Sequence, residues 1–161
     1  MTTKPRPPEP TAEEYRALAA FRYEIRRFLS YSEEAARSAG LSPQQHQLLL
    51  AVKGLPADLR PTIRVVAERL RLRHNSTVEL VDRLEALGFL RRGAGADARE
   101  VLLEVTLRGT RVLGRLSLAH RDELRTLLPA TVAALNALDA RGTGAARRSA
   151  SSAKGVARVS R

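Results

Sequence analysis

The chain has 161 residues, which is enough for one domain or for one domain with an extension. Hydrophobic residues make up 43% and aromatic residues only 4%, so the core must be built from aliphatic side chains, which favours packing of helix on helix. The absence of cysteine excludes disulfide bonds, thiolate zinc sites and catalytic thiols. The formal net charge of +11 indicates a polyanionic partner, nucleic acid before a membrane.

The first ten residues contain four prolines and no apolar segment, so we expect a disordered N-terminus over residues 1–10 and no signal peptide. No apolar run approaches the roughly 20 residues that span a membrane. We therefore expect a cytoplasmic protein without a membrane partner.

Two helices are predicted in the first third of the chain. Apolar residues recur at helical spacing from Thr11, a helix-starting residue, to Gly40, which ends the first helix. Ser42, followed by a proline, opens a second helix that ends near Gly54. Because residues 48–52 are apolar on all sides of this helix, it should be the central, buried one.

The middle of the chain predicts a helix-turn-helix followed by a wing. Thr62 caps a short third helix, and a fourth covers about residues 75–87, where Gly88 provides a left-handed end. Two β-like runs, residues 89–92 and 101–105, then form a hairpin. Two short helices, a tight turn and a hairpin in this order make a winged helix-turn-helix.

Two further helices are predicted, a long one after Thr106 and another over residues 129–140. Residues 141–161 contain six of the eleven excess positive charges and no acid, and most of the other residues there are Gly, Ala and Ser. Such a segment buries too little apolar surface to fold, so we expect a disordered basic tail that either solubilises the chain or attracts phosphate groups. The ordered domain then covers residues 11–140, with a DNA-binding core over about 42–105.

The outer face of the fourth predicted helix carries groups that suit base recognition. Asn75 and Ser76 lie near its N-terminus, where Asn pairs with adenine and Ser serves either base or a phosphate. Arg83, further along, can pair with guanine through two hydrogen bonds. Glu79 and Asp82 share this face, and they either accept a hydrogen bond from cytosine, set the register, or pair with Arg83 and Arg69. The alternative is an ordinary amphipathic surface helix.

The helix-turn-helix region contains Ala67-Glu68-Arg69-Leu70, then Arg73-His74-Asn75-Ser76-Thr77-Val78-Glu79-Leu80-Val81-Asp82-Arg83-Leu84-Glu85, then Gly88-Phe89-Leu90-Arg91-Arg92. These runs resemble the MarR family of transcriptional regulators, and Asp97-Ala98-Arg99 falls where the wing of that family has Asp-x-Arg. The resemblance implies a mainly α protein with a small β-hairpin wing, in which a winged helix-turn-helix joins a helical dimerisation domain. The dimerisation helices would be residues 11–40 and 106–140.

The resemblance also implies a homodimer that binds a pseudo-palindromic operator in double-stranded DNA. Such a protein is usually a repressor that a small, often phenolic, effector releases. Arg99 would enter the minor groove and Asp97 would hold the wing loop in shape, whereas His74 is a phosphate contact or a turn residue. The complete set of expected DNA-binding residues is Arg73, His74, Asn75, Ser76, Thr77, Glu79, Arg83, Asp97 and Arg99.

Other sites have less support in the sequence. His46 and His120 could face a shared cleft between the second and fifth helices, and His46 is the candidate contact for a small ligand. Zinc would need Glu33 or Glu123 to complete four ligands, and the alternative is a buried histidine bonded to a neighbour, so we expect no metal and no cofactor. Nothing resembles a nucleophile elbow, a phosphate-binding loop or a catalytic carboxylate pair, so we expect no enzyme.

Two functions remain open at this point. The favoured one is a sequence-specific dimeric regulator. The alternative is a winged-helix scaffold without operator specificity, which acts as a non-specific DNA-binding module or a protein-interaction module. The acids Glu79 and Asp82 and the basic tail keep that alternative open.

Overall fold

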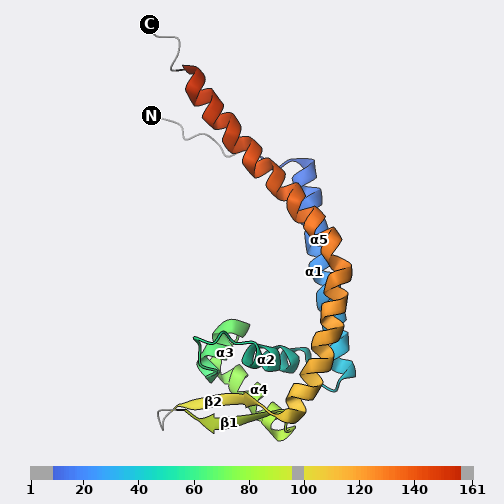
Figure 1. Cartoon of the computed structure of the whole chain (residues 1–161), viewed down its shortest axis with the longest axis vertical. Coiled ribbons are helices and arrows are strands. Elements are labelled where there is room, and N and C mark those ends of the chain that lie inside the picture. The colour runs from blue at the N-terminus through green and yellow to red at the C-terminus, as the bar shows by residue number, and fades with distance from the viewer. Residues whose placement is uncertain (1–8, 96–99, 157–161) are drawn as a thin grey trace. The chain divides into compact units, whose positions relative to one another are not determined.

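The computed structural model describes residues 9–95 and 100–156, and the side chains as far as residue 139. Its elements follow the order that the sequence predicts, with one exception given below (Figure 1). They are α1 (Ala12–Ser38), α2 (Pro43–Lys53), α3 (Ile63–Leu70), α4 (His74–Ala86), β1 (Leu90–Ala94), β2 (Val101–Val105) and α5 (Leu107–Val156). None of these helices, over the residues just given, is long and apolar enough to cross a membrane.

The chain forms two compact units. The first consists of Leu29–Asp122, and the second of Met1–Phe28 together with Glu123–Arg161. The first unit contains the helix-turn-helix and the hairpin, so it holds most of the residues that the sequence predicts to bind DNA.

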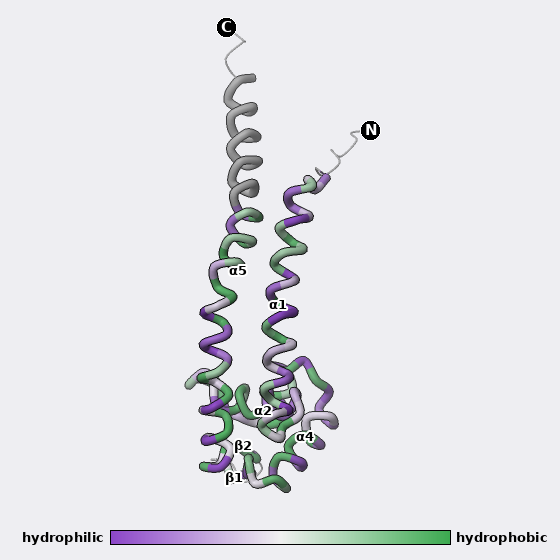
Figure 2. The backbone as a smooth tube through the Cα atoms, turned by 90° about the vertical axis from the view of Figure 1, so that its right-hand side faces the viewer, coloured by the Kyte–Doolittle hydropathy of each residue, from purple (hydrophilic) through white to green (hydrophobic). Residues whose placement is uncertain are grey.

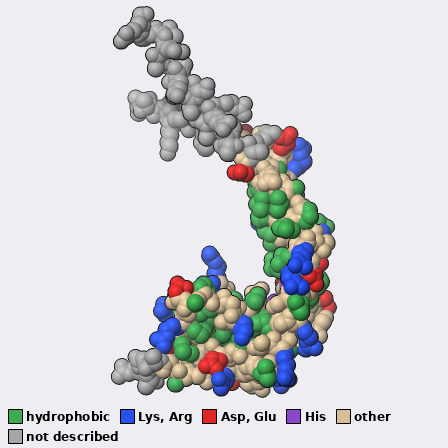
Figure 3. Space-filling model, in the orientation of Figure 1, with side chains coloured by type: hydrophobic (Ala, Val, Ile, Leu, Met, Phe, Trp, Pro, Cys, Tyr) green, Lys and Arg blue, Asp and Glu red, His purple; other side chains and the backbone are tan. Residues whose placement is uncertain are grey.

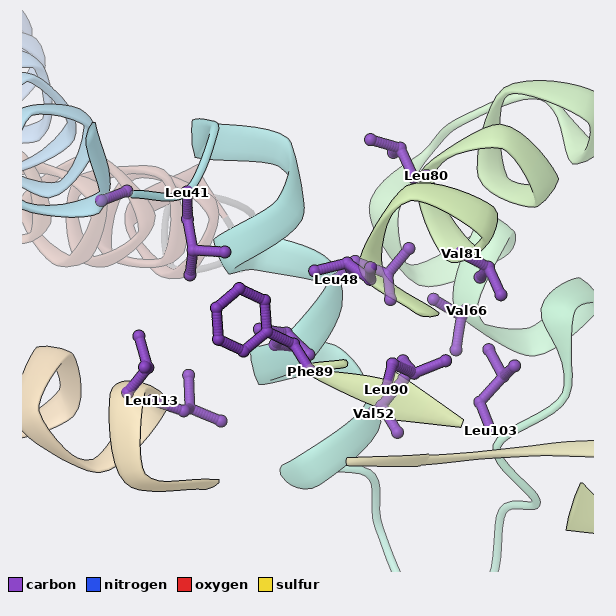
Figure 4. Packing of buried hydrophobic residues seen from close by; sticks show 14 of the residues in the cluster. Leu41, Leu48, Val52, Val66, Leu80, Val81, Phe89, Leu90, Leu103 and Leu113 are labelled. Atoms are coloured by element: carbon purple, nitrogen blue, oxygen red, sulfur yellow. The ribbon is translucent and has the colours of Figure 1, made fainter. Parts of the chain in front are cut away.

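The core of the first unit is built around α2, as predicted. Leu48 and Leu49 are completely buried in it, and the ring of Phe89 lies among the aliphatic side chains between α2 and α5 (Figure 4). Burying each such side chain stabilises the fold by about 1.5–3 kcal/mol. Leu50 departs from the expectation of burial on every side, because 47% of its surface is exposed.

The predicted helix starts are real caps. The Ser42 hydroxyl accepts a hydrogen bond from the Gln45 amide at 3.2 Å, and the Gln45 side chain accepts one from the Ser42 amide at 2.8 Å, which is a capping box. The Thr62 hydroxyl accepts from the Val65 amide at 3.3 Å and so caps α3. These bonds satisfy backbone donors that the first helical turn leaves unpaired.

The hairpin is antiparallel and begins directly after α4. Gly88, with φ +71°, ends α4 in the left-handed conformation that the sequence predicts. The strands pair from Leu90 opposite Val105 to Ala94 opposite Val101. The hairpin therefore lies next to the recognition helix, as the wing of a winged helix-turn-helix does.

One prediction about the helices is wrong. The sequence predicts separate helices before and after Pro129, but α5 is continuous and contains this proline. Proline has a helix-compatible φ, and its cost is a lost hydrogen bond and local crowding, which a helix of strong helix formers on both sides tolerates. The backbone of α5 also continues as helix past Ala140, where the predicted tail begins, because Ala and Arg extend an existing helix at little cost.

In the second unit, the first half of α1 runs antiparallel to α5. Arg27 lies 3.9 Å from Glu123, and alanines from both helices line a hollow further along the pair. Hydrophobic residues recur along the backbone of both helices (Figure 2), and large apolar side chains are exposed on their surface (Figure 3). The exposed ones are Tyr15, Leu18, Tyr23 and Ile25 on α1, and Leu124, Leu128, Val132 and Leu135 on α5.

Candidate nucleic-acid interface

The outward face of α4 carries polar side chains, and its inward face packs on the core. The inward residues Leu80, Val81 and Leu84 are buried, as the spacing predicts. The outward face consists of Asn75, Ser76, Glu79, Asp82, Arg83 and Ala86, all of which are exposed.

Thr77 is not on this outward face, so its predicted groove-facing position is wrong. The residue is completely buried, and its hydroxyl donates a hydrogen bond to the carbonyl oxygen of Arg73 at 3.1 Å. At about 100° per residue, position 77 lies on the opposite side of the helix from position 79. Thr77 therefore helps to hold the first turn of α4.

The wing is fastened to the recognition helix by an arginine that the sequence analysis missed. Arg92 on β1 donates to Asp82 at 2.5 Å and to Glu85 with its other guanidinium nitrogen, both on α4. The hydrogen bond to Asp82 raises the pKa of the Arg92 guanidinium, and Glu85 adds to this effect against partial burial. The negative charge of Asp82 is thus balanced by Arg92 within the protein.

Other arginines near the wing are also paired with carboxylates. Arg91 on β1 donates to Glu104, directly across the hairpin, at 2.8 and 2.5 Å. Arg60 lies 2.6 Å from Glu100. The predicted wing residues Asp97 and Arg99 lie outside the described residues.

Basic side chains gather where α3 turns into α4. Arg71 occupies this turn with φ +54°, a left-handed conformation that glycine adopts freely and an arginine adopts at a cost in free energy. Over residues 9–95 and 100–139, the side chains of Arg69, Arg71 and Arg73 form no ion pair, and all three are exposed. Arg73 is also the N-cap of α4 and gives it no side-chain cap, and the exposed His74 follows. Cations beside unpaired backbone N–H groups suit a phosphate.

Glu79 and Arg83 form only a loose pair. Their closest charged atoms, Oε2 and Nη2, are 3.6 Å apart, beyond hydrogen-bond range, and 68% and 67% of the two side chains are exposed. An exposed pair of this kind contributes little to stability, so either side chain can turn to another partner.

The structure brings the two predicted histidines together in the first unit. The rings of His46 and His120 are stacked, with centroids 4.9 Å apart. His120 Nδ1 lies 2.5 Å from the carbonyl oxygen of Leu116, which only accepts, so this nitrogen carries a proton; its Nε2 lies 2.7 Å from the hydroxyl of Ser32.

His46 is the less satisfied member of the pair. Its Nε2 is buried and has no hydrogen-bond partner among the described residues. Burial lowers the pKa of the His46 imidazole below 6.5, and the neighbouring His120 lowers it further. Among the described residues, no three His, Asp or Glu side chains lie close enough together to hold a metal ion.

Residues 39–100 match the model of the MarR family. No curated protein matches the chain. The match covers α2, α3, α4 and β1 and ends directly before β2, so it includes the outward face of α4 and the first strand of the hairpin.

Solved structures share the fold at low sequence identity. A MarR family transcription regulator superposes with a TM-score of 0.63 at 18% identity, over 87% of this chain and 92% of that one. A mutant of MepR from S. aureus, bound to an oligodeoxyribonucleotide, gives 0.58 at 19% identity, over 75% and 84%. CouR from Rhodococcus jostii, bound to p-coumaroyl-CoA, gives 0.54 at 21% identity, over 70% and 83%.

These findings confirm the resemblance that the sequence suggests. The matched segment and the strand that follows it have the element order, the left-handed turn at Gly88 and the hairpin of a winged helix-turn-helix. Residues 39–100 match the MarR family, and the chain has the winged helix-turn-helix fold of the solved MarR family structures.

Proposed function

We propose that this chain is a homodimeric, sequence-specific transcription regulator of double-stranded DNA, and that it is a repressor which a small ligand releases. The observation that carries the proposal is the surface of α4. Four exposed side chains that can hydrogen-bond to base edges stand on one face of this helix, next to a hairpin that Arg92 fastens to it. They are Asn75, Ser76, Glu79 and Arg83.

The chemistry of this surface fits the major groove. An amide, a hydroxyl and a guanidinium can each read base edges there, and the groove admits one helix. The unpaired arginines Arg69, Arg71 and Arg73 stand at the N-terminal end of the same helix, where phosphate contacts fix the register. The net charge of +11 adds attraction that is independent of sequence.

Dimerisation is supported by the exposed apolar side chains of α1 and α5. Eight large hydrophobic residues of the second unit are between 41% and 60% exposed. Patches of this kind on a soluble chain mark an interaction surface. A two-fold dimer would cover them and present two copies of α4 to two half-sites of an operator.

Release by a ligand is supported by the relationship to the family and by CouR, which is bound to p-coumaroyl-CoA. In this chain, His46 is the candidate contact because its buried Nε2 lacks a partner among the described residues. A ligand that accepts or donates a hydrogen bond there would compensate the cost of burying that nitrogen.

The test is selection of duplexes from a random library with the full chain, followed by competition at physiological salt. A regulator should prefer the selected duplex over bulk DNA by about 10³-fold or more. Enrichment of no sequence, with binding that only follows salt concentration, would contradict the proposal. That result would favour a scaffold that binds DNA without operator specificity.

A further inference from the structure

We propose that Glu79 is a specificity-determining residue, which selects a cytosine in the operator through the cytosine amino group, while Arg83 selects a guanine within one or two base pairs of it. The inference rests on the proposed function and assigns a base to the centre of the recognition helix. The two acids on the outward face of α4, Glu79 and Asp82, differ in how closely a cation pairs with them.

Asp82 is engaged within the protein. Its Oδ1 accepts a hydrogen bond from Arg92 at 2.5 Å, and Arg92 also binds Glu85. The charge of Asp82 is therefore largely compensated before any DNA arrives, and its role is to position the wing.

Glu79 has no comparable partner. Among the described residues, its one charged neighbour is Arg83, at 3.6 Å, and both side chains are about two-thirds exposed. A carboxylate that a neighbouring cation compensates only loosely weakens binding on a surface that approaches phosphates, because like charges repel. A hydrogen bond to a base that only a carboxylate can form would offset this electrostatic repulsion.

The position of Glu79 on the helix indicates where that contact lies. At about 100° per residue, Glu79 falls near the middle of the exposed arc, with Asp82 on one side and Ser76 and Arg83 on the other. The middle of the arc is the part that points most directly at the floor of the groove when a helix enters it.

A carboxylate discriminates between bases by its charge and by its lack of protons. It accepts a hydrogen bond from the amino group of cytosine, whereas the O4 of thymine and the O6 and N7 of guanine are themselves acceptors and repel it. Adenine also has an amino donor, but its neighbouring N7 is an acceptor that repels the carboxylate, so cytosine is preferred. Arg83 has the opposite preference and binds guanine O6 and N7 in a bidentate way. Four residues of helix advance about 6 Å, which is less than two base-pair steps of about 3.4 Å.

The experiment compares duplex selection by the full-length wild type, Glu79→Gln and Glu79→Ala. The wild type should enrich one cytosine, and a thymine in its place should weaken binding about 5- to 150-fold. Glu79→Ala should lose most of this preference and bind bulk DNA at least as tightly as the wild type. Glu79→Gln should shift the preference to adenine, because glutamine pairs with adenine N6 and N7.

Glu68→Gln is the matched control. Glu68 lies on α3, is 64% exposed and pairs with Arg64 at 3.2 Å, so its change removes the same charge without altering the outward face of α4. It should leave every base preference unchanged. Arg83→Ala should relax the preference for guanine and leave the cytosine in place.

The experiment distinguishes a failure of this inference from a failure of the proposed function. If the wild type enriches an operator and Glu79→Gln enriches the same bases with the same preference, Glu79 reads no base and the inference is wrong by itself. If the wild type enriches no sequence, the proposed function fails, and the assignment of a cytosine fails with it.

Discussion

His46 and His120 have stacked rings but differ in the hydrogen bonds of their ring nitrogens. His120 has oxygen neighbours on both ring nitrogens, whereas His46 Nε2 has none among the described residues. Both residues are more than nine-tenths buried, and their rings are stacked. Protonating His46 would place a cation in a buried position next to a second imidazole, which is the physical reason that its pKa is low.

This low pKa predicts a pH dependence of stability. In the folded protein His46 stays neutral below pH 6.5, whereas in the unfolded chain it takes up a proton near its usual pKa. The free energy of unfolding should therefore be at its full value above about pH 6.5 and fall below it, by up to about 1.4 kcal/mol per pH unit, towards the folded pKa. Urea unfolding at pH 7.5 and 5.5 measures this loss.

His46→Gln should lose much less stability on acidification than the wild type does. The exposed His74 provides the control, because His74→Gln should leave the pH dependence as it is. Equal pH dependence in the wild type and in His46→Gln would show that another group is responsible.

At the scale of single residues, the sequence predicted the features that depend only on the local backbone conformation. The outward face of α4 follows from the helical period, and the left-handed Gly88 follows from the steric freedom of glycine. It did not predict the burial of Thr77, whose small polar side chain fits either face, or the contact of Arg92 with Asp82, which depends on how the strand packs on the helix.

At the scale of elements, the start of α5 is held against the hairpin by a close approach of backbones. Thr106 donates its hydroxyl to the carbonyl of Gly88 at 2.8 Å and accepts from the Gly109 amide at 3.1 Å. A Cβ on Gly109 would collide with the carbonyl oxygen of Phe89 and lie 2.8 Å from the Val105 side chain. The order of the elements predicted this junction between the hairpin and α5. The predicted break in the helix at Pro129 is wrong, because a proline ends many helices but not all.

Gly109→Ala should therefore destabilise the fold by about 1–3 kcal/mol, since the backbone of Phe89 cannot move aside cheaply. Gly114→Ala, in the same helix, is the matched control: its Cβ would meet nothing within 4 Å, so it should stabilise the protein by about 0.5–1 kcal/mol. Thermal unfolding of both variants measures the difference. Similar shifts in both would rule out the close approach as the cause.

At the scale of the whole molecule, α1 and α5 carry exposed apolar side chains that we expect a second copy of the chain to cover. Leu135→Asp should prevent dimerisation, because it places a charge where a partner helix would pack. Leu135 is 44% exposed in the single chain, so the change should cost the monomer little. Sedimentation at micromolar concentration should give a dimer for the wild type and a monomer for the variant.

Leu59→Asp is the control for this experiment, since Leu59 has a similar exposure of 38% but lies in the first unit. It should remain dimeric. A wild type that sediments as a compact monomer would contradict both the dimer and the reading of two half-sites.

The basic segment from residue 141 onwards gives a second prediction at this scale. Cutting the chain after Ala140 removes six positive charges per chain. Each neutralised phosphate contributes about 0.9 to the slope of log K against log salt, so truncation should make the slope shallower by a few units per dimer. It should weaken specific and bulk DNA binding alike, while the melting temperature stays almost unchanged, because this end of the chain contains few large apolar residues to bury.

Binding titrations over a range of salt concentrations measure the slope. An unchanged slope would mean that the segment only keeps the chain soluble. A large fall in melting temperature would mean instead that the segment packs against the folded domain.

The wing also has a connection on its second edge. Thr62, which caps α3, forms an isolated bridge with Leu102, and the Leu103 amide donates to the carbonyl of Pro61 at 2.8 Å. Because β2 has backbone partners on both sides, the wing cannot detach without also releasing the start of α3. The amide protons of β2 and those of α3 should therefore exchange with deuterium at similar, slow rates, as parts of one cooperative opening event.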